Sequence, residues 1–320
     1  MSKSLTELQK DFVNMRFGMF IHFNSATVQF HTGELVDWEY GHENYGKPRQ
    51  FPFDPADWNP VDLDCAQWAR AGKTAGVQFA ALTTKHHEGF GLWPSAHSQH
   101  CVRNASVKRD VVAEYLAAFR NEGICAGLYF SILDLTSAIG KRKCTPADKQ
   151  LVYGQITELL TNYGEIPFFI IDGWDAPWGG PSREAMPFEE VDALVKGLQP
   201  NCLLMNIGDS DIRYTDIAFY ESAAGQKIDG AFCGPGASCN YLTGQWFWRS
   251  DDPERELRTA QWVVDTIRES NAHNASFILN ASPNPRGTLD GNMMQRFAEV
   301  GEIYEKLPDV AELPEGWLRR

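Results

Sequence analysis

The chain is patterned as short apolar runs that alternate with longer amphipathic stretches. Seven runs have the length and the aromatic and β-branched composition of strands buried on both faces, as in a parallel sheet. They cover residues 17–24, 77–84, 124–132, 167–171, 202–207, 217–220 and 276–280. Helical spacing of apolar residues predicts helices at residues 61–75, 110–121, 146–163, 187–198, 253–268 and 293–304. The composition of residues 25–59 and 223–243 is typical of loops.

Alternating strands and helices predict an α/β fold with a parallel sheet. The chain has 320 residues, 43% of them hydrophobic, which is enough for one large core. We therefore expect residues 1–320 to form a single catalytic domain, a (β/α)8-like barrel of the TIM type. The pattern does not reveal an eighth strand, so an irregular barrel is expected.

The formal net charge of −13 disfavours nucleic acid and anionic membranes as partners. The seven cysteines are odd in number and form no CxxC pair, which argues against a zinc site or a disulfide scaffold. Only a Cys233–Cys239 pair within one loop is left open. No run reaches transmembrane length, and residues 1–10 lack the apolar core of a signal peptide. We expect a cytoplasmic protein.

Polar side chains gather where the predicted strands end. In chain order they are His22, His86, His87, Tyr129, Asp172, Glu221 and Asn280. The carboxyl ends of barrel strands converge on one face, where α/β barrels carry their chemistry. Any one of these residues could be a helix cap or half of an ion pair. Burying so many polar groups on one face costs free energy unless they serve a ligand.

Four segments resemble the signatures of one family, the α-L-fucosidases of glycoside hydrolase family 29. Residues 17–23 resemble FGxFxHW, residues 85–90 resemble KHHDGF, Asp172-Gly173 resembles the nucleophile segment, and residues 279–287 resemble LNxxPxxxG. The motifs follow the family's order over nearly the whole chain. Phe23 replaces the usual Trp, and Glu88 the usual Asp. The chain resembles a single-domain variant without the C-terminal β-sandwich.

The resemblance implies a retaining exo-glycosidase that releases terminal α-L-fucose. Retention requires two carboxyl groups about 5–5.5 Å apart, one a nucleophile and the other an acid/base. Asp172 matches the family's nucleophile. The position of the acid/base varies in the family, and the nearby carboxyl groups are Asp209, Asp211, Asp216, Glu221, Asp229, Asp251, Asp252 and Glu254.

The predicted sixth strand helps to choose among these carboxyl groups. Asp216 lies just before the start of that strand and Glu221 follows its end, about 16 Å away. Only Glu221 is then expected on the catalytic face, so it is favoured as the acid/base. Asp209 and Asp211 follow the fifth strand and stay open as alternatives.

The resemblance implies that three histidines and three other residues bind the hydroxyl groups of fucose. They are His22, His86, His87, Tyr129, Asp37 and Trp38. The rings of Trp38, Trp174 and Trp246 suit the apolar C5-methyl side of the sugar, although Trp174 and Trp246 could equally be loop packing. No metal or cofactor is expected. The expected partner is a fucosylated glycan or oligosaccharide, with linkage, aglycone and oligomeric state, including a homo-oligomer, left open.

Two other functions remain as hypotheses. A metal-dependent barrel hydrolase could use His22, His86 and His87, although adjacent histidines on a regular strand point to opposite faces. A catalytically silent carbohydrate-binding barrel would keep the pocket without a working acid/base. A sister specificity such as α-L-galactosidase would keep the same chemistry.

Overall fold

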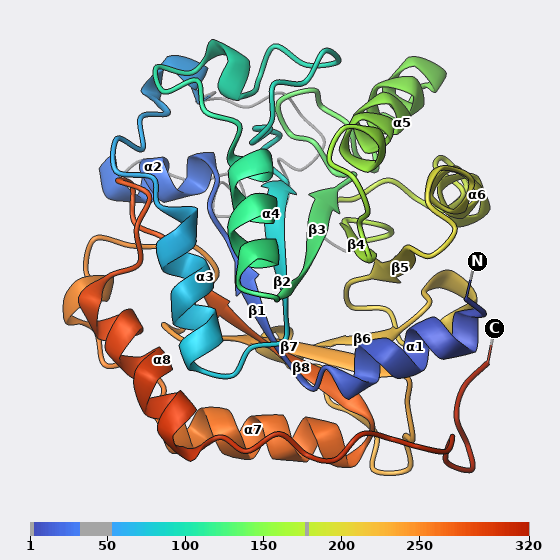
Figure 1. The fold of residues 1–320 in the computed structure, drawn as a ribbon. Coiled ribbons are helices and arrows are strands. Elements are labelled where there is room, and N and C mark those ends of the chain that lie inside the picture. Colours follow the sequence, from blue (N-terminus) through green and yellow to red (C-terminus); the bar gives the residue numbers. More distant parts are fainter. Residues whose placement is uncertain (1–2, 33–52, 177–178, 320) are drawn as a thin grey trace.

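The computed structural model describes residues 3–32, 53–176 and 179–319. This part of the chain contains eight strands: β1 (Phe17–Ile21), β2 (Phe79–Lys85), β3 (Cys125–Ser131), β4 (Phe168–Asp172), β5 (Leu203–Asn206), β6 (Ala218–Glu221), β7 (Gly236–Tyr241) and β8 (Ala275–Ala281). The α-helices are α1 (Leu5–Asn14), α2 (Ser25–Thr32), α3 (Cys65–Thr74), α4 (Val111–Asn121), α5 (Pro146–Thr161), α6 (Phe188–Leu198), α7 (Ala260–Ala272) and α8 (Gly291–Ile303). Helices surround the strands (Figure 1).

The strands form one parallel sheet in the order β5-β4-β3-β2-β1-β8-β7-β6. Strands that follow one another in sequence pair with each other except β5 and β6, and β1 pairs with β8, as in a (β/α)8 barrel. Within the described residues no ladder joins β5 to β6. The loop between them spans this seam instead, because Phe219 N donates to Asp209 O at 2.8 Å and Asp216 N donates to Leu204 O at 2.8 Å. The expected TIM-type fold is confirmed as a nearly closed barrel.

The apolar core of the described residues has two large parts, one between the strands and the outer helices and one inside the barrel, and a small cluster of Ala26 and Phe247. At the amino ends of the strands, Phe12 of α1 packs against Phe79 and Phe168, with ring centroids 4.8 and 5.6 Å apart. These three phenylalanine rings form a plug that fills the amino-terminal end of the barrel. Gly18 leaves room for them, because a Cβ there would lie 2.4 Å from the Phe79 ring. The plug seals one end, so the carboxyl ends of the strands form the open end of the barrel.

Side-chain caps set where several helices begin. The Asp64 side chain accepts from Gln67 N, so α3 begins at Cys65 rather than at the predicted residue 61. Thr145 and Asp148 form a capping box that begins α5. Thr259 caps α7, whereas Pro253 lies in a 3-10 helix, Asp252–Glu254, so the predicted start of that helix at residue 253 is wrong.

In the described residues, each of the two predicted loops contains an element that the sequence pattern did not predict. Residues 25–59 begin with helix α2, and residues 223–243 contain β7, the eighth strand that the sequence pattern did not reveal. The β7 sequence, Gly-Ala-Ser-Cys-Asn-Tyr, has no β-branched residue, and its pairing with β6 and β8 outweighs that weak propensity. Helix α1 was not predicted either.

The structure also bears on the Cys233–Cys239 disulfide that the sequence left open and on membrane-spanning helices. All seven cysteines are free thiols, so the pair Cys233–Cys239 does not form. Among the helices of the described residues, none combines the length and the apolar character that crossing a membrane requires.

Candidate active site

The carboxyl ends of β3 and β4 bring Tyr129 and Asp172 together. Asp172 is the last residue of β4, and its neighbour in the β3 register is Ser131. The buried Tyr129 hydroxyl donates to Asp172 Oδ2 at 2.6 Å. Burial raises the pKa of Tyr129 well above its ordinary value, and the charge of Asp172 adds to that. The phenol therefore stays protonated and holds one carboxylate oxygen in a fixed orientation.

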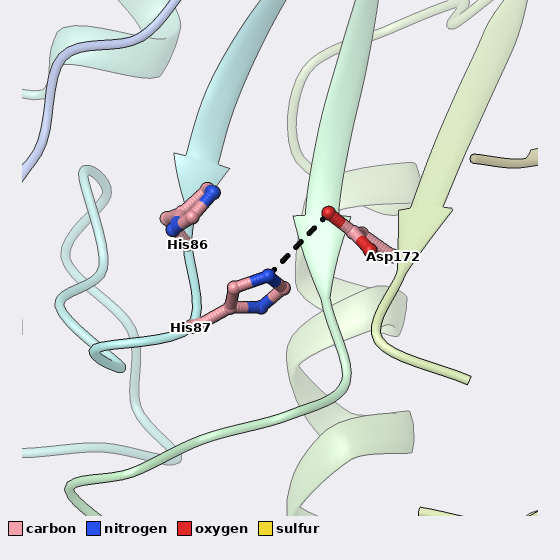
Figure 2. A group of neighbouring side chains, drawn as sticks. All are labelled: His86, His87 and Asp172. Carbon is pink, nitrogen blue, oxygen red and sulfur yellow. Dashed lines mark ion pairs between the residues drawn. The ribbon is translucent and has the colours of Figure 1, made fainter. Parts of the chain in front are cut away.

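His87 lies across from Asp172 (Figure 2), and a hydrogen bond to Ser131 fixes its orientation. The Ser131 hydroxyl donates to Leu133 O at 2.8 Å, so its oxygen accepts from His87 Nδ1, 2.7 Å away. This assigns the proton to Nδ1 and turns Nε2 toward Asp172 Oδ2, at 3.6 Å.

His22 and His86 line the same end of the barrel as neutral imidazoles. Burial lowers the pKa of both well below the ordinary value, and a neighbouring histidine adds to the effect in each case. The His22 ring stacks on Trp246 at 4.9 Å, and its Nδ1 lies 2.7 Å from Asn280 Oδ1. The Asn280 amide donates to Trp246 O at 2.8 Å, so its oxygen accepts from His22. The His86 ring stacks on Tyr129 at 5.6 Å.

Glu221, the last residue of β6, is the second carboxyl group of the site. Burial raises its pKa from 4.5 to about 7, and the negative charge of Asp172 adds to the rise. The Gln226 side chain holds its backbone, since Glu221 N donates to Gln226 Oε1 at 2.7 Å and Gln226 Nε2 donates to Gly208 O at 2.9 Å. Asp172 and Glu221 line one cavity of about 460 Å³.

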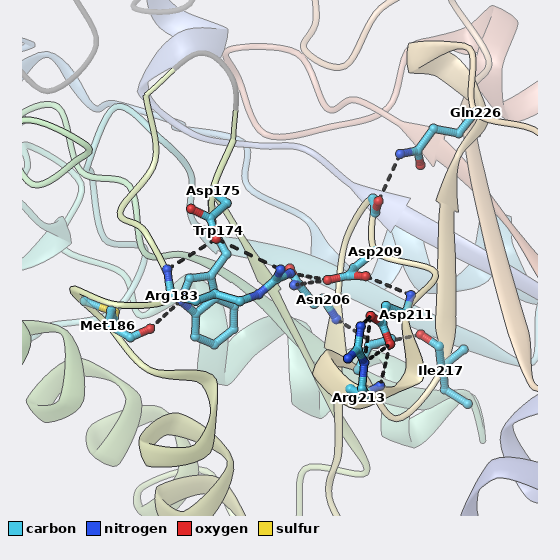
Figure 3. A network of polar contacts seen from close by, with 12 residues as sticks. Trp174, Asp175, Arg183, Met186, Asn206, Asp209, Asp211, Arg213, Ile217 and Gln226 are labelled. Atoms are coloured by element: carbon cyan, nitrogen blue, oxygen red, sulfur yellow. Dashed lines mark hydrogen bonds and ion pairs between the residues drawn. The ribbon is translucent and has the colours of Figure 1, made fainter. Parts of the chain in front are cut away.

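The two alternative acids after β5 are each paired with an arginine (Figure 3). Asp209 lines the cavity but forms an ion pair with Arg183 and accepts from Asn206 Nδ2 at 3.2 Å. Asp211 accepts from Arg213 Nε at 3.0 Å, and this contact lowers its pKa. The lowered pKa of Asp211 favours its charged form, which is unsuited to donating a proton, and Asp209 is held by its ion pair with Arg183.

Three predicted sugar-binding residues remain, namely Trp174, Asp37 and Trp38. Trp174 is buried, donates from Nε1 to Met186 O at 2.8 Å and packs beside Phe188, so it anchors the segment after β4 (Figure 3). Asp37 and Trp38 lie outside the described residues.

Among the described residues, one group of side chains has donor atoms close enough to hold a metal ion. One donor atom from each of His86, His87 and Asp172 lies within 4.8 Å of the others (Figure 2). His22, the third histidine of the predicted metal set, does not belong to this group. All three members have partners of another kind: Ser131 bonds His87, Tyr129 bonds Asp172, and His86 Nδ1 lies 3.3 Å from Glu88 Oε2.

The sequence pattern missed several residues that shape the site. Ser131 follows Tyr129 by two positions on β3, and residues two apart on a strand face the same side, a signal that could have found it. Arg183 and Gln226 reach the cavity from two separate loops, and their spacing in the sequence carries no such signal. Asn206 also lines the cavity, as the last residue of β5.

Comparisons with known proteins give one consistent result. A family model described as "Alpha-L-fucosidase" matches residues 1–306. A putative alpha-L-fucosidase 1 of Oryza sativa is 30% identical over 90% of this chain and 56% of its own length, and alpha-L-fucosidase 1 of Arabidopsis thaliana is 28% identical over 88% and 57%. The chain thus spans little more than half of these relatives. Alpha-L-fucosidase isoenzyme 1 from Paenibacillus thiaminolyticus superposes with a TM-score of 0.75, at 26% identity over 93% of this chain and 76% of that one.

Proposed function

We propose, from the premise that this chain belongs to the α-L-fucosidase family, that its barrel hydrolyses terminal α-L-fucosides of oligosaccharides or glycoconjugates. A pair of unlike carboxyl groups carries the proposal. Asp172 accepts a hydrogen bond from the Tyr129 hydroxyl, whereas the pKa of Glu221 is raised to about 7. The first group is suited to nucleophilic attack and the second to proton donation near neutral pH.

The proposed reaction is a double displacement. A carboxylate oxygen of Asp172 forms a bond to the anomeric carbon of fucose while the bond from that carbon to the leaving oxygen breaks. The Glu221 proton moves to the leaving oxygen, so the aglycone departs as a neutral alcohol. Ionised Glu221 then takes a proton from water, whose oxygen displaces Asp172. Two displacements at one carbon retain the α configuration.

The histidines and Trp246 support a sugar ligand beside these carboxyl groups. A neutral imidazole donates one hydrogen bond and accepts another, which suits a hydroxyl group. His22 donates from Nδ1 to Asn280, so Nε2 is its acceptor for a sugar hydroxyl. The stacked Trp246 ring offers an apolar face for the C5-methyl side of fucose. Contacts of this kind tighten in the transition state and so contribute to the rate.

Hydrolysis of 4-nitrophenyl α-L-fucoside by the purified chain tests the proposal, with the α-D-galactoside and β-D-glucoside as controls. We expect turnover of the fucoside alone, α-L-fucose as the first anomer in the proton NMR spectrum, and loss of turnover in Asp172→Asn. β-L-Fucose as the first product would show a single displacement and overturn the assignment of Asp172 as nucleophile. No turnover of the fucoside would favour the silent carbohydrate-binding barrel.

Azide rescue tests the assignment of Glu221. In Glu221→Ala, natural oligosaccharides should react far more slowly, whereas aryl fucosides with acidic phenols should still form the fucosyl-enzyme. Azide needs no general base, so it should restore turnover and give the α-fucosyl azide. The same assay on Asp209→Asn should show no azide effect. Rescue of the Asp209 variant in place of the Glu221 variant would reverse the two assignments.

The donor cluster of His86, His87 and Asp172 favours one competing function, a metal-dependent hydrolase. Prolonged treatment with EDTA separates the two, because the proposed reaction needs no ion and should keep its rate. Activity lost to EDTA and regained with a divalent ion would replace our proposal. The net charge of −13 supports the proposal that neither nucleic acid nor an anionic membrane is a partner. A cytoplasmic location and a homo-oligomer stay predictions.

A further inference from the structure

The cavity that holds Asp172 and Glu221 extends away from the histidines. Its walls come from the segments that follow β4, β5 and β6, and among the described residues that line it neither His22 nor Trp246 occurs. In the proposed reaction, Glu221 gives its proton to the leaving oxygen, so the aglycone must lie on the Glu221 side. At about 460 Å³, the cavity has the size of a small-molecule site. Its position makes it the place of the leaving group.

Arg183 is the one cation among the described residues that line this cavity, and several contacts fix it (Figure 3). Its guanidinium forms an ion pair with Asp209 and stacks 4.0 Å from the centroid of the Tyr214 ring. Its backbone N–H donates to Asp175 Oδ2 at 3.3 Å. A guanidinium held in this way loses little freedom when it binds a ligand, which favours specific recognition.

Of the two aspartates that contact Arg183 in this cavity, Asp175 has the more accessible carboxylate. The Asp175 side chain is 48% exposed, and that of Asp209 only 14%. Asp175 has a positive φ of 46°, and the buried Trp174 beside it anchors the segment through its bond to Met186. Asp175 and Arg183 are therefore the groups that face a ligand, and Asp209 is a positioning residue for Arg183.

The charges of the cavity indicate what kind of aglycone it accepts. Among the described residues that line the cavity, three aspartates, Asp172, Asp175 and Asp209, outnumber the one cation, Arg183. An anionic aglycone would meet this excess of negative charge and be repelled. A neutral hydroxyl-rich ring would instead donate to Asp175 and accept from Arg183, which are strong charge-assisted hydrogen bonds.

We propose that this cavity is a leaving-group subsite for a neutral saccharide, recognised by Asp175 and Arg183. The proposal rests on the fucosidase activity proposed above and adds the class of aglycone. Three substrates separate the contributions: α-L-fucosyl fluoride, whose leaving group is a single atom, a neutral fucosyl disaccharide, and the same disaccharide with a uronic acid as the acceptor sugar.

The measured quantity is the ratio of kcat/KM for the neutral disaccharide to kcat/KM for the fluoride. We expect Asp175→Ala and Arg183→Gln each to lower this ratio by about 10- to 100-fold, the range for a lost hydrogen bond to a charged group. Glu184→Gln, an exposed neighbour outside the cavity lining, should leave the ratio unchanged. The wild type should prefer the neutral disaccharide to the uronate, and Asp175→Asn should narrow that preference.

Each result supports or contradicts a separate statement. A ratio unchanged in both Asp175→Ala and Arg183→Gln would overturn the subsite, because both residues would then act on the reaction as a whole. Turnover of the fluoride reports that each variant is folded, so a misfolded variant cannot imitate the expected result. Equal cleavage of the uronate and the neutral disaccharide would overturn the class of aglycone. Failure of the wild type on all three substrates would defeat the fucosidase activity itself.

Discussion

The raised pKa of Glu221 predicts a pH-dependent free energy of unfolding that Glu221→Gln should remove. The rise from 4.5 to about 7 means that the folded protein binds the proton more tightly than the unfolded chain does. The stability that this protonation contributes is therefore complete below about pH 4.5 and is lost as the pH rises through about 7. Glutamine resembles the protonated carboxyl group and keeps its contribution at every pH.

The magnitude follows from the size of the pKa shift. Each pKa unit corresponds to about 1.36 kcal/mol, so a rise of about 2.5 units amounts to about 3 kcal/mol in full. Between about pH 5.5 and about pH 8.5, the wild type crosses the upper 1.5 units of this range, or about 2 kcal/mol. The free energy of unfolding of Glu221→Gln, relative to the wild type, should grow by that amount.

Urea denaturation of both proteins at the two pH values measures this difference. Glu269→Gln, an exposed glutamate on α7, controls for the loss of one negative charge from an acidic chain. In an Asp172→Asn background the gain should shrink, because the charge of Asp172 is the second cause of the raised pKa. A free-energy difference between Glu221→Gln and the wild type that does not change with pH would refute the reasoning.

Two buried contacts and the rate profile give further predictions. Ser131→Ala should lower kcat/KM for aryl fucosides about 10- to 100-fold, because His87 loses the acceptor that orients it; steady-state kinetics and an unchanged circular dichroism spectrum check this. Lys85→Met should lower the free energy of unfolding, measured by urea denaturation, by about 3–5 kcal/mol, because it leaves Asp134 as a buried charge without its ion-pair partner. Lys3→Met removes an exposed ion pair and should change this free energy little. In the wild type, kcat/KM should fall as the pH rises above about 7, because Glu221 then loses its proton. If kcat/KM instead stayed unchanged up to about pH 9, the result would contradict the role of Glu221 as the acid.

The sequence predicted the strands that bury continuous apolar runs and the polar side chains at their ends. Asp172 and Glu221 were found because a parallel strand brings its last residue to a known face of the barrel. Strand β7 was missed because Gly236, Ala237, Ser238 and their neighbours have a weak strand propensity, which the pairing with β6 and β8 outweighs. Helix α2 was missed because residues 25–59 were interpreted from their overall polar composition.

The walls of the cavity could not be predicted for a different reason. Arg183 meets Asp209 from a position 26 residues away, and Gln226 reaches Gly208 across the seam where β5 and β6 lack a ladder. Such contacts depend on how separate loops fold against each other, and no periodicity in the sequence records them. The strand ends could be predicted because regular geometry places them, whereas the leaving-group side required the structure.

Covalent trapping of the nucleophile tests the central claim most directly. A 2-deoxy-2-fluoro-fucosyl fluoride slows both displacements, and its good leaving group favours accumulation of the fucosyl-enzyme. We predict that the intact mass of the wild type rises by one 2-fluorofucosyl group and that peptide mapping places the group on Asp172. Asp172→Asn should take up no label. Label on Glu221, on Asp209 or on any other carboxylate would contradict the account.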